Sequence, residues 1–408
     1  MQGTSFCRAS LSNFALMTIL AAPLLHCGDD TGTGASTTGG GGSGGVEDGG
    51  GGGTAGSGGT GGTGGAGASG PINAPADEWT FIDFPEAVCM NGTPTGIAIN
   101  PHASSEDVLL FLEGGNACFN LISCLSTANL DGYDAAKFAS QGPGTLDGSP
   151  YLDRDNAANP LADFSYVYVP YCTGDVHAGD IADVMVAGEV RQFHGHKNMG
   201  LYLDRLVQTF PNAKRVVLSG ASAGGFGAAF NYDLVAEAFG PSVKVTLIDD
   251  SGPPMGDQFI AECLQSHLKT TWGLSETLPA DCVDCAADSW AEPFVNHILT
   301  KFPERSIGLI SSEADATITT FWAFGEDNCA KLNSGLPIYP EGKYLLGLED
   351  LRDRIGAGTN FGMFLVPGDE HVFMDNGLNA VSVDGVKLED WIRDAIAEEP
   401  TWGSVSAP

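Results

Sequence analysis

The sequence predicts an α/β fold in which a mostly parallel sheet carries helices on both faces. Short runs rich in β-branched and aromatic residues are almost continuously apolar, as expected of strands buried on both faces of a parallel sheet. Segments with helical apolar periodicity lie between them, and Gly-rich or polar turns separate the two kinds of segment. This alternation is typical of α/β domains. The residues from Pro71 onward are numerous enough to form one large core.

The predicted elements follow one another along the chain without a visible internal repeat. The expected strands are Val108–Leu112, Phe164–Val169, Arg215–Leu218, Val243–Ile248, Ile307–Ile310 and Phe361–Val366. The expected helices are Asn198–Phe210, Phe226–Phe239 and Val386–Ala397. The first helix ends before Pro211, which cannot continue it, and the last one shows a clear apolar stripe.

The first 72 residues are predicted to lie outside the folded domain. Arg8 and the apolar run Phe14–Leu25 indicate a signal peptide over residues 1–27, since 12 residues are too few to span a bilayer as a helix. The sequence LLHC resembles a lipobox with Cys27 as the lipidated residue, although His26 stands where a small residue is usual, so ordinary cleavage and release stays open. Residues 28–72 are predicted to be a disordered linker, because 23 of the 57 glycines fall between residues 28 and 70. The folded domain is then expected over residues 73–408.

Cysteine usage is consistent with export. Eight cysteines follow Cys27, an even number that favours up to four disulfides in an oxidising compartment. Cys282 and Cys285 could be half of a zinc site, but no second close pair accompanies them, and we expect no metal.

The charge of the chain excludes some partners. There are 51 acidic residues against 18 Lys and Arg, a net charge of −33, and all but four of the acidic residues follow Pro71. Such a surface repels phosphates, so we expect neither nucleic-acid binding nor docking of the folded domain on an anionic membrane.

One motif points to a nucleophile. The predicted strand Arg215–Leu218 runs into Ser219-Gly220-Ala221-Ser222-Ala223-Gly224, and a helix follows. This is the strand, G-x-S-x-G, helix arrangement of a nucleophile elbow, in which a strained turn projects the serine hydroxyl above the sheet. A structural turn is the alternative, but the flanking strand and helix favour Ser222 as a nucleophile.

An early glycine pair is the candidate for oxyanion stabilisation. The strand Val108–Leu112 is followed by Glu113-Gly114-Gly115-Asn116, and glycines there allow main-chain N–H groups to turn toward the site. We assign the oxyanion hole to the N–H groups of Gly115, Asn116 and Ala223. A plain β–α turn is the alternative.

The general base is expected after the last strand, because the triad order of this architecture is serine, acid, histidine. Of the eight histidines, His371 follows the strand Phe361–Val366 on its outgoing loop. His267 and His297 lie in predicted helical or Cys-rich segments and are not expected to act.

The orienting acid is expected one strand before the base. The strand Ile307–Ile310 is followed by Glu313 and Asp315, of which Asp315 is preferred and Glu313 is the reserve. Asp249 and Asp250, on the preceding strand, are the second alternative. A short acid in such a place can also be a helix cap.

Four strings together resemble a known family. LEGGNACFN, YVPYCTGDVHAG, LSGASAGGFG and PGDEHVF occur in an order and spacing similar to the pectin acetylesterase/Notum carboxylesterases, over about residues 80–400. The resemblance implies an α/β-hydrolase fold stabilised by disulfides, with Ser222, Asp315 and His371 as the triad and a Cys118–Cys124 disulfide. Where the animal branch often has Trp, this chain has Asn116, which implies a different acyl pocket. The acid segment EADATI is only loosely similar, so Glu313 remains open.

Two further segments resemble family segments near the mouth of the active site. They contain Asp175, His177, His194 and His196. Close histidines suggest a metal, but no cysteine or paired carboxylate completes a ligand set, so we interpret these four residues as lining the substrate.

The sequence thus predicts an exported serine carboxylesterase that removes O-acyl groups, with acetyl expected, and needs no cofactor. Pectin is the substrate that the family name suggests, but a strongly acidic domain repels polygalacturonate, so a neutral acetylated glycan or small ester fits as well. The alternatives are a non-catalytic, surface-anchored binding module and a lipase or polyester depolymerase. We expect a monomer that is either secreted or held at the outer membrane or cell surface by its lipid.

Overall fold

The computed structural model describes residues 70–408. The predicted signal peptide, the candidate lipid site at Cys27 and nearly all of the predicted linker lie outside these residues. Ile72, which we assigned to the linker, is only 7% exposed, and its N–H group donates to Thr209 Oγ1 at 2.8 Å. The packed domain therefore begins slightly earlier than predicted. Within residues 70–408, no helix has the length and apolarity to cross a bilayer.

The described chain alternates strands and helices. The strands are β1 (Thr80–Val88), β2 (Pro94–Asn100), β3 (Asp107–Leu112), β4 (Ser165–Val169), β5 (Ile181–Val186), β6 (Glu189–Phe193), β7 (Arg215–Ala221), β8 (Lys244–Asp250), β9 (Ile307–Ser312), β10 (Phe361–Val366), β11 (Ser382–Val383) and β12 (Val386–Lys387). The α-helices are α1 (Leu121–Ser126), α2 (Ala135–Gln141), α3 (Pro143–Asp147), α4 (Gly195–Thr209), α5 (Ala223–Phe230), α6 (Tyr232–Phe239), α7 (Glu262–Trp272), α8 (Ala291–Lys301), α9 (Ala316–Trp322), α10 (Glu326–Cys329), α11 (Lys343–Asp350), α12 (Met374–Gly377) and α13 (Leu388–Ala397). Single turns of other helix types are η1 (Leu274–Glu276), η2 (Val283–Ala286), η3 (Ala323–Gly325) and η4 (Leu351–Ile355).

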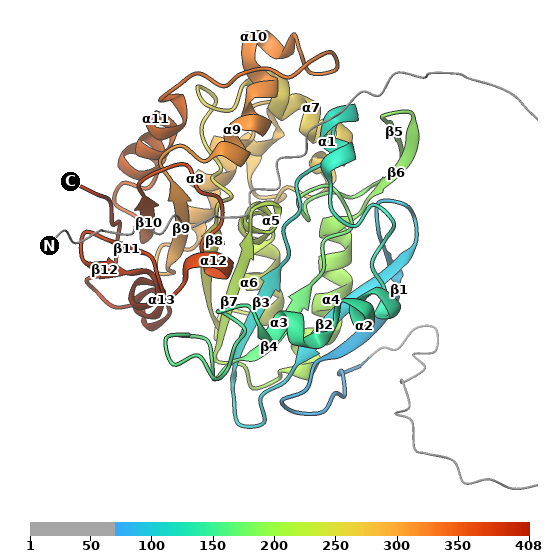
Figure 1. Ribbon diagram of the computed structural model, residues 1–408, viewed down its shortest axis with the longest axis vertical. Coiled ribbons are helices and arrows are strands. Elements are labelled where there is room, and N and C mark those ends of the chain that lie inside the picture. Colours follow the sequence, from blue (N-terminus) through green and yellow to red (C-terminus); the bar gives the residue numbers. More distant parts are fainter. Residues whose placement is uncertain (1–69) are drawn as a thin grey trace, which may run out of the picture. The chain divides into compact units, whose positions relative to one another are not determined.

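One large sheet organises the domain (Figure 1). Its strand order is β1-β2-β4-β3-β7-β8-β9-β10, and every pairing from β4 onward is parallel. The six strands expected from the sequence are the six strands of this parallel part. The antiparallel strands β1 and β2 at one edge were not predicted, because they mix polar and apolar residues. The prediction of a mostly parallel α/β sheet is confirmed.

Each face of the sheet has its own core, because successive side chains of a strand point to opposite faces. Leu110 of β3 packs with the side chains of α4, α6 and α8, whereas Leu109 and Phe111 pack with those of α2 and α13. Helices therefore cover both faces, as expected. Figure 1 also shows α1, α7, α9 and α10 together at the top of the view.

Two predicted helices differ in detail from the structure. The segment Phe226–Phe239 was expected to be one helix, but it is divided at Asn231 between α5, which already begins at Ala223, and α6. The Asn231 amide is fully buried and donates to the main-chain O of His177 at 2.9 Å and of Gly227 at 2.8 Å. These bonds compete with the helical ladder and end α5. The first two residues of Val386–Ala397 form the short strand β12 instead of helix.

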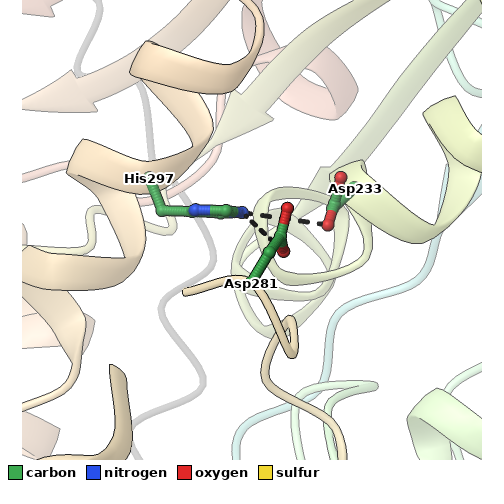
Figure 2. Close-up of side chains that lie close together, drawn as sticks. All are labelled: Asp233, Asp281 and His297. Atoms are coloured by element: carbon green, nitrogen blue, oxygen red, sulfur yellow. Dashed lines mark ion pairs between the residues drawn. The ribbon is translucent and has the colours of Figure 1, made fainter. Parts of the chain in front are cut away.

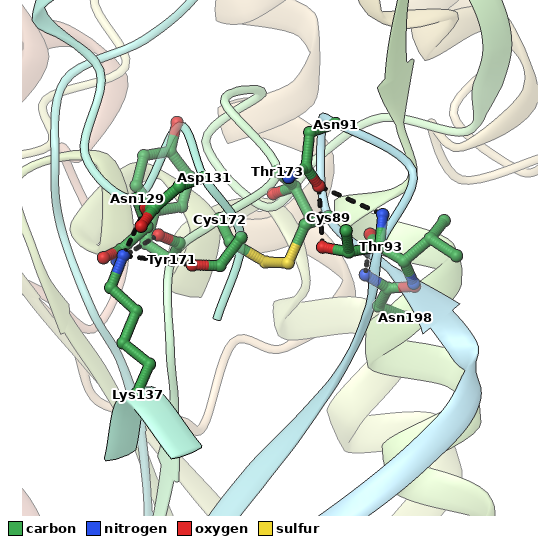
Figure 3. The surroundings of a disulfide bond; sticks show 12 residues. Cys89, Asn91, Thr93, Asn129, Asp131, Lys137, Tyr171, Cys172, Thr173 and Asn198 are labelled. Carbon is green, nitrogen blue, oxygen red and sulfur yellow. Dashed lines mark hydrogen bonds and ion pairs between the residues drawn. A yellow bond between two sulfur atoms is a disulfide. The ribbon is translucent and has the colours of Figure 1, made fainter. Parts of the chain in front are cut away.

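All eight cysteines after Cys27 form disulfides. The pairs are Cys89–Cys172, Cys118–Cys124, Cys263–Cys329 and Cys282–Cys285. The second pair is the one that the family resemblance implied, and the last pair accounts for the two cysteines considered for zinc. Figure 3 shows that Cys89–Cys172 joins the segments after β1 and β4, beside the Asn129 side chain that donates to the main-chain O of Tyr171. This disulfide ties the segment after β4, which contains Tyr171, to the segment after β1.

Candidate active site

Ser222 lies in a strained turn between β7 and α5. Its φ is 58° and its ψ is −119°, a conformation that non-glycine residues rarely adopt. A Cβ at Gly220 would overlap the main-chain O of Gly224, and a Cβ at Gly224 would overlap the main-chain O of Leu112. The two glycines of the motif are therefore required by close approach of strand and helix, as in a nucleophile elbow.

The glycine pair after β3 places free N–H groups next to this turn. Gly115 has a φ of 153°, and a Cβ there would overlap Ala128. Asn116 has a φ of 65°, and its amide donates to the main-chain O of Ser126 at 2.7 Å, which fixes the loop. The N–H groups of Gly115, Asn116 and Ala223 donate no hydrogen bond to another group of residues 70–408. They are available to an oxyanion.

The structure brings His371 and Asp315 together. His371 Nδ1 lies 2.7 Å from Asp315 Oδ2, and the Asp315 side chain is fully buried. Its other oxygen caps α9 by accepting from the N–H groups of Thr317 at 2.9 Å and Ile318 at 2.8 Å. His371 Nε2 is buried and has no hydrogen-bond partner in the described part of the chain. The reserve residue Glu313 makes no side-chain bond to His371.

The second alternative for the acid is also accounted for. Asp249 and Asp250 end β8 and are both buried. Asp249 accepts from the N–H group of Gly252 at 2.8 Å, and burial raises its pKa well above the usual value. Asp250 accepts from the N–H groups of Phe373 and Met374, both at 2.8 Å, and burial raises its pKa to about 6. Neither carboxylate bonds to the His371 ring.

The four residues that we interpreted as lining the substrate are not among the residues that line the cavity beside Ser222. They are Asp175, His177, His194 and His196, all largely buried. Asp175 accepts from the N–H group of Gly195 at 2.8 Å, and His177 Nε2 donates to the main-chain O of Glu113 at 2.9 Å. Burial lowers the pKa of His177 to about 4, so its ring is neutral. His194 pairs with Asp180 at 2.7 Å and His196 with Asn231 at 2.8 Å. These groups support the loops behind the glycine pair.

The residues that do line a cavity beside Ser222 are apolar. The cavity has a volume of about 80 Å³ and runs from Ser222, Asn116 and Ala223 between α5, α7, α8 and α9. Its walls include Phe226, Phe230, Leu264, Leu268, Phe321 and Trp322. The buried side-chain amide of Gln265 in the wall has its hydrogen bonds made: it donates to Asp257 Oδ1 and to the main-chain O of Ile260, and it accepts from the N–H group of Ala291. Sequence reasoning missed this cavity, because apolar positions on helices indicate burial without indicating an empty space.

Comparison with known proteins identifies the family. Residues 76–312 match the family described as Pectinacetylesterase. The chain belongs to the pectinacetylesterase family. The human palmitoleoyl-protein carboxylesterase NOTUM is 31% identical over 178 residues, which are 40% of this chain and 34% of that protein. The chain spans about a third of the length of the curated relatives it matches first.

Two further relatives of this pectinacetylesterase-family chain refine the comparison. The structure of the Wnt deacylase Notum from Drosophila superimposes with a TM-score of 0.57 at 19% identity, over 82% of this chain and 97% of that chain. This likeness confirms the α/β-hydrolase fold. A zebrafish (Danio rerio) protein named inactive palmitoleoyl-protein carboxylesterase notum1b is 35% identical over 92 residues, 22% of this chain and 65% of that protein. A relative can therefore keep the sequence similarity of this family and carry a name that describes it as inactive.

One other cluster in this family member has residue types that bind metals. Asp233, Asp281 and His297 approach one another on α6, before η2 and on α8 (Figure 2). However, Lys301 Nζ lies 2.7 Å from Asp233 and 3.0 Å from both Glu237 and Asp281. The ammonium group occupies the position between the carboxylates. We interpret the cluster as an ion-pair clamp that ties α6 to α8.

Proposed function

We propose that this chain is a serine carboxylesterase. The observation that carries the proposal is the arrangement of His371, whose Nδ1 pairs with buried Asp315 while its buried Nε2 has no partner. A ring held at one nitrogen and free at the other is suited to accept a proton from a nearby hydroxyl. Ser222 supplies that hydroxyl from the end of β7 in the same sheet, in the strained turn that exposes a nucleophile.

The reaction follows from these positions. Ser222 Oγ attacks the ester carbonyl as His371 Nε2 takes its proton, and Asp315 stabilises the imidazolium that forms. The oxyanion accepts hydrogen bonds from Gly115, Asn116 and Ala223. His371 returns the proton to the leaving alcohol, and the acyl group stays on Ser222. Water, deprotonated by His371, then releases the acid.

The cavity supports an acyl group longer than the acetyl group expected from the sequence. It opens beside Ser222, and its walls are almost entirely apolar side chains. Each buried methylene contributes about 0.8 kcal/mol, so short alkyl chains gain affinity that acetate lacks. The relatives' names mention a palmitoleoyl group, which is also an apolar acyl chain. We therefore propose apolar acyl esters as the substrate class.

Active-site labelling tests the proposal. A fluorophosphonate should attach to Ser222, and the labelled peptide should be found by mass spectrometry. Ser222→Ala should abolish both labelling and hydrolysis of nitrophenyl butyrate. Ser140→Ala is the control, because Ser140 is exposed on α2 and its loss should change neither. Activity retained in Ser222→Ala would refute the mechanism, and an unlabelled, inactive wild-type enzyme would favour the non-catalytic alternative.

We also propose that the protein is exported and acts as a monomer. Four disulfides support an oxidising compartment. The lipobox-like sequence supports lipid attachment at Cys27, with the Gly-rich residues after it as a linker. Metabolic labelling with palmitate should mark the wild type and fail in Cys27→Ser. Light scattering of the domain should give the mass of a single chain.

A further inference from the structure

We propose that Asp250 is a positioning residue that holds the His371 ring at the correct place relative to Ser222. This inference rests on the proposed esterase mechanism. The sequence offered Asp250 as an alternative triad acid, but Asp315 holds the ring. Asp250 is nevertheless fully buried at the end of β8, between the strand that carries Ser222 and the strand that leads to Asp315. A buried carboxylate needs a reason to be kept, since its desolvation is costly.

The carboxylate of Asp250 binds the main chain directly after the base. Oδ2 accepts from the N–H groups of Phe373 and Met374, both at 2.8 Å, and Oδ1 accepts from Phe373 at 3.1 Å. Ser251 Oγ lies 3.1 Å from Asp250 Oδ1 and accepts from the N–H group of Val372 at 3.2 Å. Asp250 and Ser251 therefore bind three consecutive N–H groups that begin one residue after His371.

This segment has a conformation that needs such support. Val372 has a φ of 59°, which is strained for a β-branched residue. The strain lies in the residue that joins His371 to the segment bound by Asp250. If the bonds to Asp250 are lost, Val372 can relax to an ordinary conformation, and the His371 ring then moves away from its present position.

The main chain of Asp250 contacts the nucleophile as well. Its carbonyl O accepts from the N–H group of Ser222 at 2.7 Å. One residue thus binds the elbow through its main chain and the loop of the base through its side chain. A displacement of about 1 Å between reacting groups can lower a rate about 10²-fold. By binding both segments, Asp250 therefore fixes the distance between Ser222 and His371 on which the proposed reaction depends.

The decisive variant is Asp250→Asn. Asparagine has the same size, but its NH₂ group is a donor and cannot accept a hydrogen bond from the main-chain N–H group that it faces. We expect kcat for nitrophenyl butyrate to fall about 10²-fold with KM within about twofold, because substrate binding is not touched. Asp175→Asn is the matched control, since Asp175 is equally buried and accepts main-chain N–H groups of another segment.

A double-mutant cycle separates positioning from a general structural effect. In a His371→Ala background there is no base to position, so Asp250→Asn should change the residual rate by no more than about twofold. Any loss caused by Asp175→Asn should persist in that background. An Asp250→Asn loss that persists undiminished in His371→Ala, or a kcat near that of wild type, would overturn the proposal.

Two further measurements test the proposal if Asp250→Asn fails to fold or if the enzyme lacks esterase activity. Ser251→Ala removes the acceptor of the Val372 N–H group and the hydroxyl that donates to Asp250 Oδ1, leaves the bonds from Phe373 and Met374 to Asp250 in place, and should lower kcat about fivefold, again only when His371 is present. The downfield proton resonance between His371 and Asp315, assigned by its loss in His371→Ala, should broaden or shift in the Asp250 or Ser251 variant. An unchanged resonance refutes positioning. A wild type with the resonance but no hydrolysis refutes the esterase instead.

Discussion

Filling the apolar cavity should change which acyl chains the enzyme prefers. Ala229 lies on α5 in the wall of the cavity and is 8% exposed. Ala229→Leu adds three carbon atoms to a space of about 80 Å³. At about 0.8 kcal/mol per buried methylene, butyrate should exceed acetate by about 1.6 kcal/mol in the wild type, or about 15-fold in kcat/KM. In Ala229→Leu this ratio should fall to about 1, while hydrolysis of the acetate ester changes little.

The assay is kcat/KM for nitrophenyl acetate, butyrate and hexanoate in both enzymes. Ala238→Leu is the control, because Ala238 is exposed on the neighbouring helix α6 and its variant should keep the wild-type ratios. Overpacking costs about 1–3 kcal/mol of stability, so the melting temperature of each variant is measured alongside. A wild type that hydrolyses acetate and butyrate equally, or a folded Ala229→Leu with unchanged ratios, would show that the acyl chain does not enter this cavity.

The remaining predictions concern the acid, the ion-pair clamp and the buried carboxyls. Asp315→Asn should lower kcat about 10³- to 10⁴-fold by disturbing the His371 tautomer, whereas Glu313→Gln should stay within about threefold; equal losses in the two variants would reopen the choice of acid. Lys301→Met should lower the free energy of unfolding in urea by about 2 kcal/mol, because it leaves partly buried carboxylates without their cation; no loss would mean that the clamp contributes nothing. Burial raises the pKa of Asp250 to about 6, so the folded state holds that proton at pH values where the unfolded chain has released it. The difference between this pKa and the usual value of 3.8 corresponds to about 3 kcal/mol of folding free energy. That stabilisation is present in full below pH 4 and is lost as the pH rises through 6. The melting temperature should therefore rise between pH 7 and pH 5, less so in Asp250→Asn, and a fall over that range would contradict the linkage.

The sequence predicted correctly those parts of the fold that depend on short, local patterns of residues. The six parallel strands are apolar on both faces, and the elbow combines a strand, two glycines and a helix within a dozen residues. The edge strand β1 was missed because one of its sides faces solvent, which admits charged residues and a proline, and its neighbour β2 was missed because it is short and mixes Pro, Thr, Gly and Asn with apolar residues. Their assignment depends on pairing partners, which a linear pattern does not contain.

The candidate site could be predicted only as far as strand ends determine it. Ser222, His371 and the acid segment follow three strands of one sheet, and that much is topological. The choice between Asp315 and Glu313 depends on side-chain direction, which is set when Asp315 caps α9. The histidines near Asp175 were assigned to the substrate because their segments resemble family segments near the mouth of the active site and no complete set of metal ligands accompanies them. Their real partners are main-chain and side-chain groups far away in the sequence, so only the folded chain reveals them as support.

The charge and the cavity act on different halves of the ester. The net charge of −33 is spread over the chain and creates a long-range field, so it acts on whatever approaches from solvent, mainly the alcohol part. In the proposed reaction the acyl part enters the largely apolar cavity beside Ser222, where recognition depends mainly on shape and buried area. An anionic alcohol such as polygalacturonate is thus repelled before any acyl contact forms, whereas a neutral ester meets no such barrier. Because the field is screened by salt and the cavity is not, ionic strength should alter selectivity among alcohols and leave the preference among acyl chains unchanged.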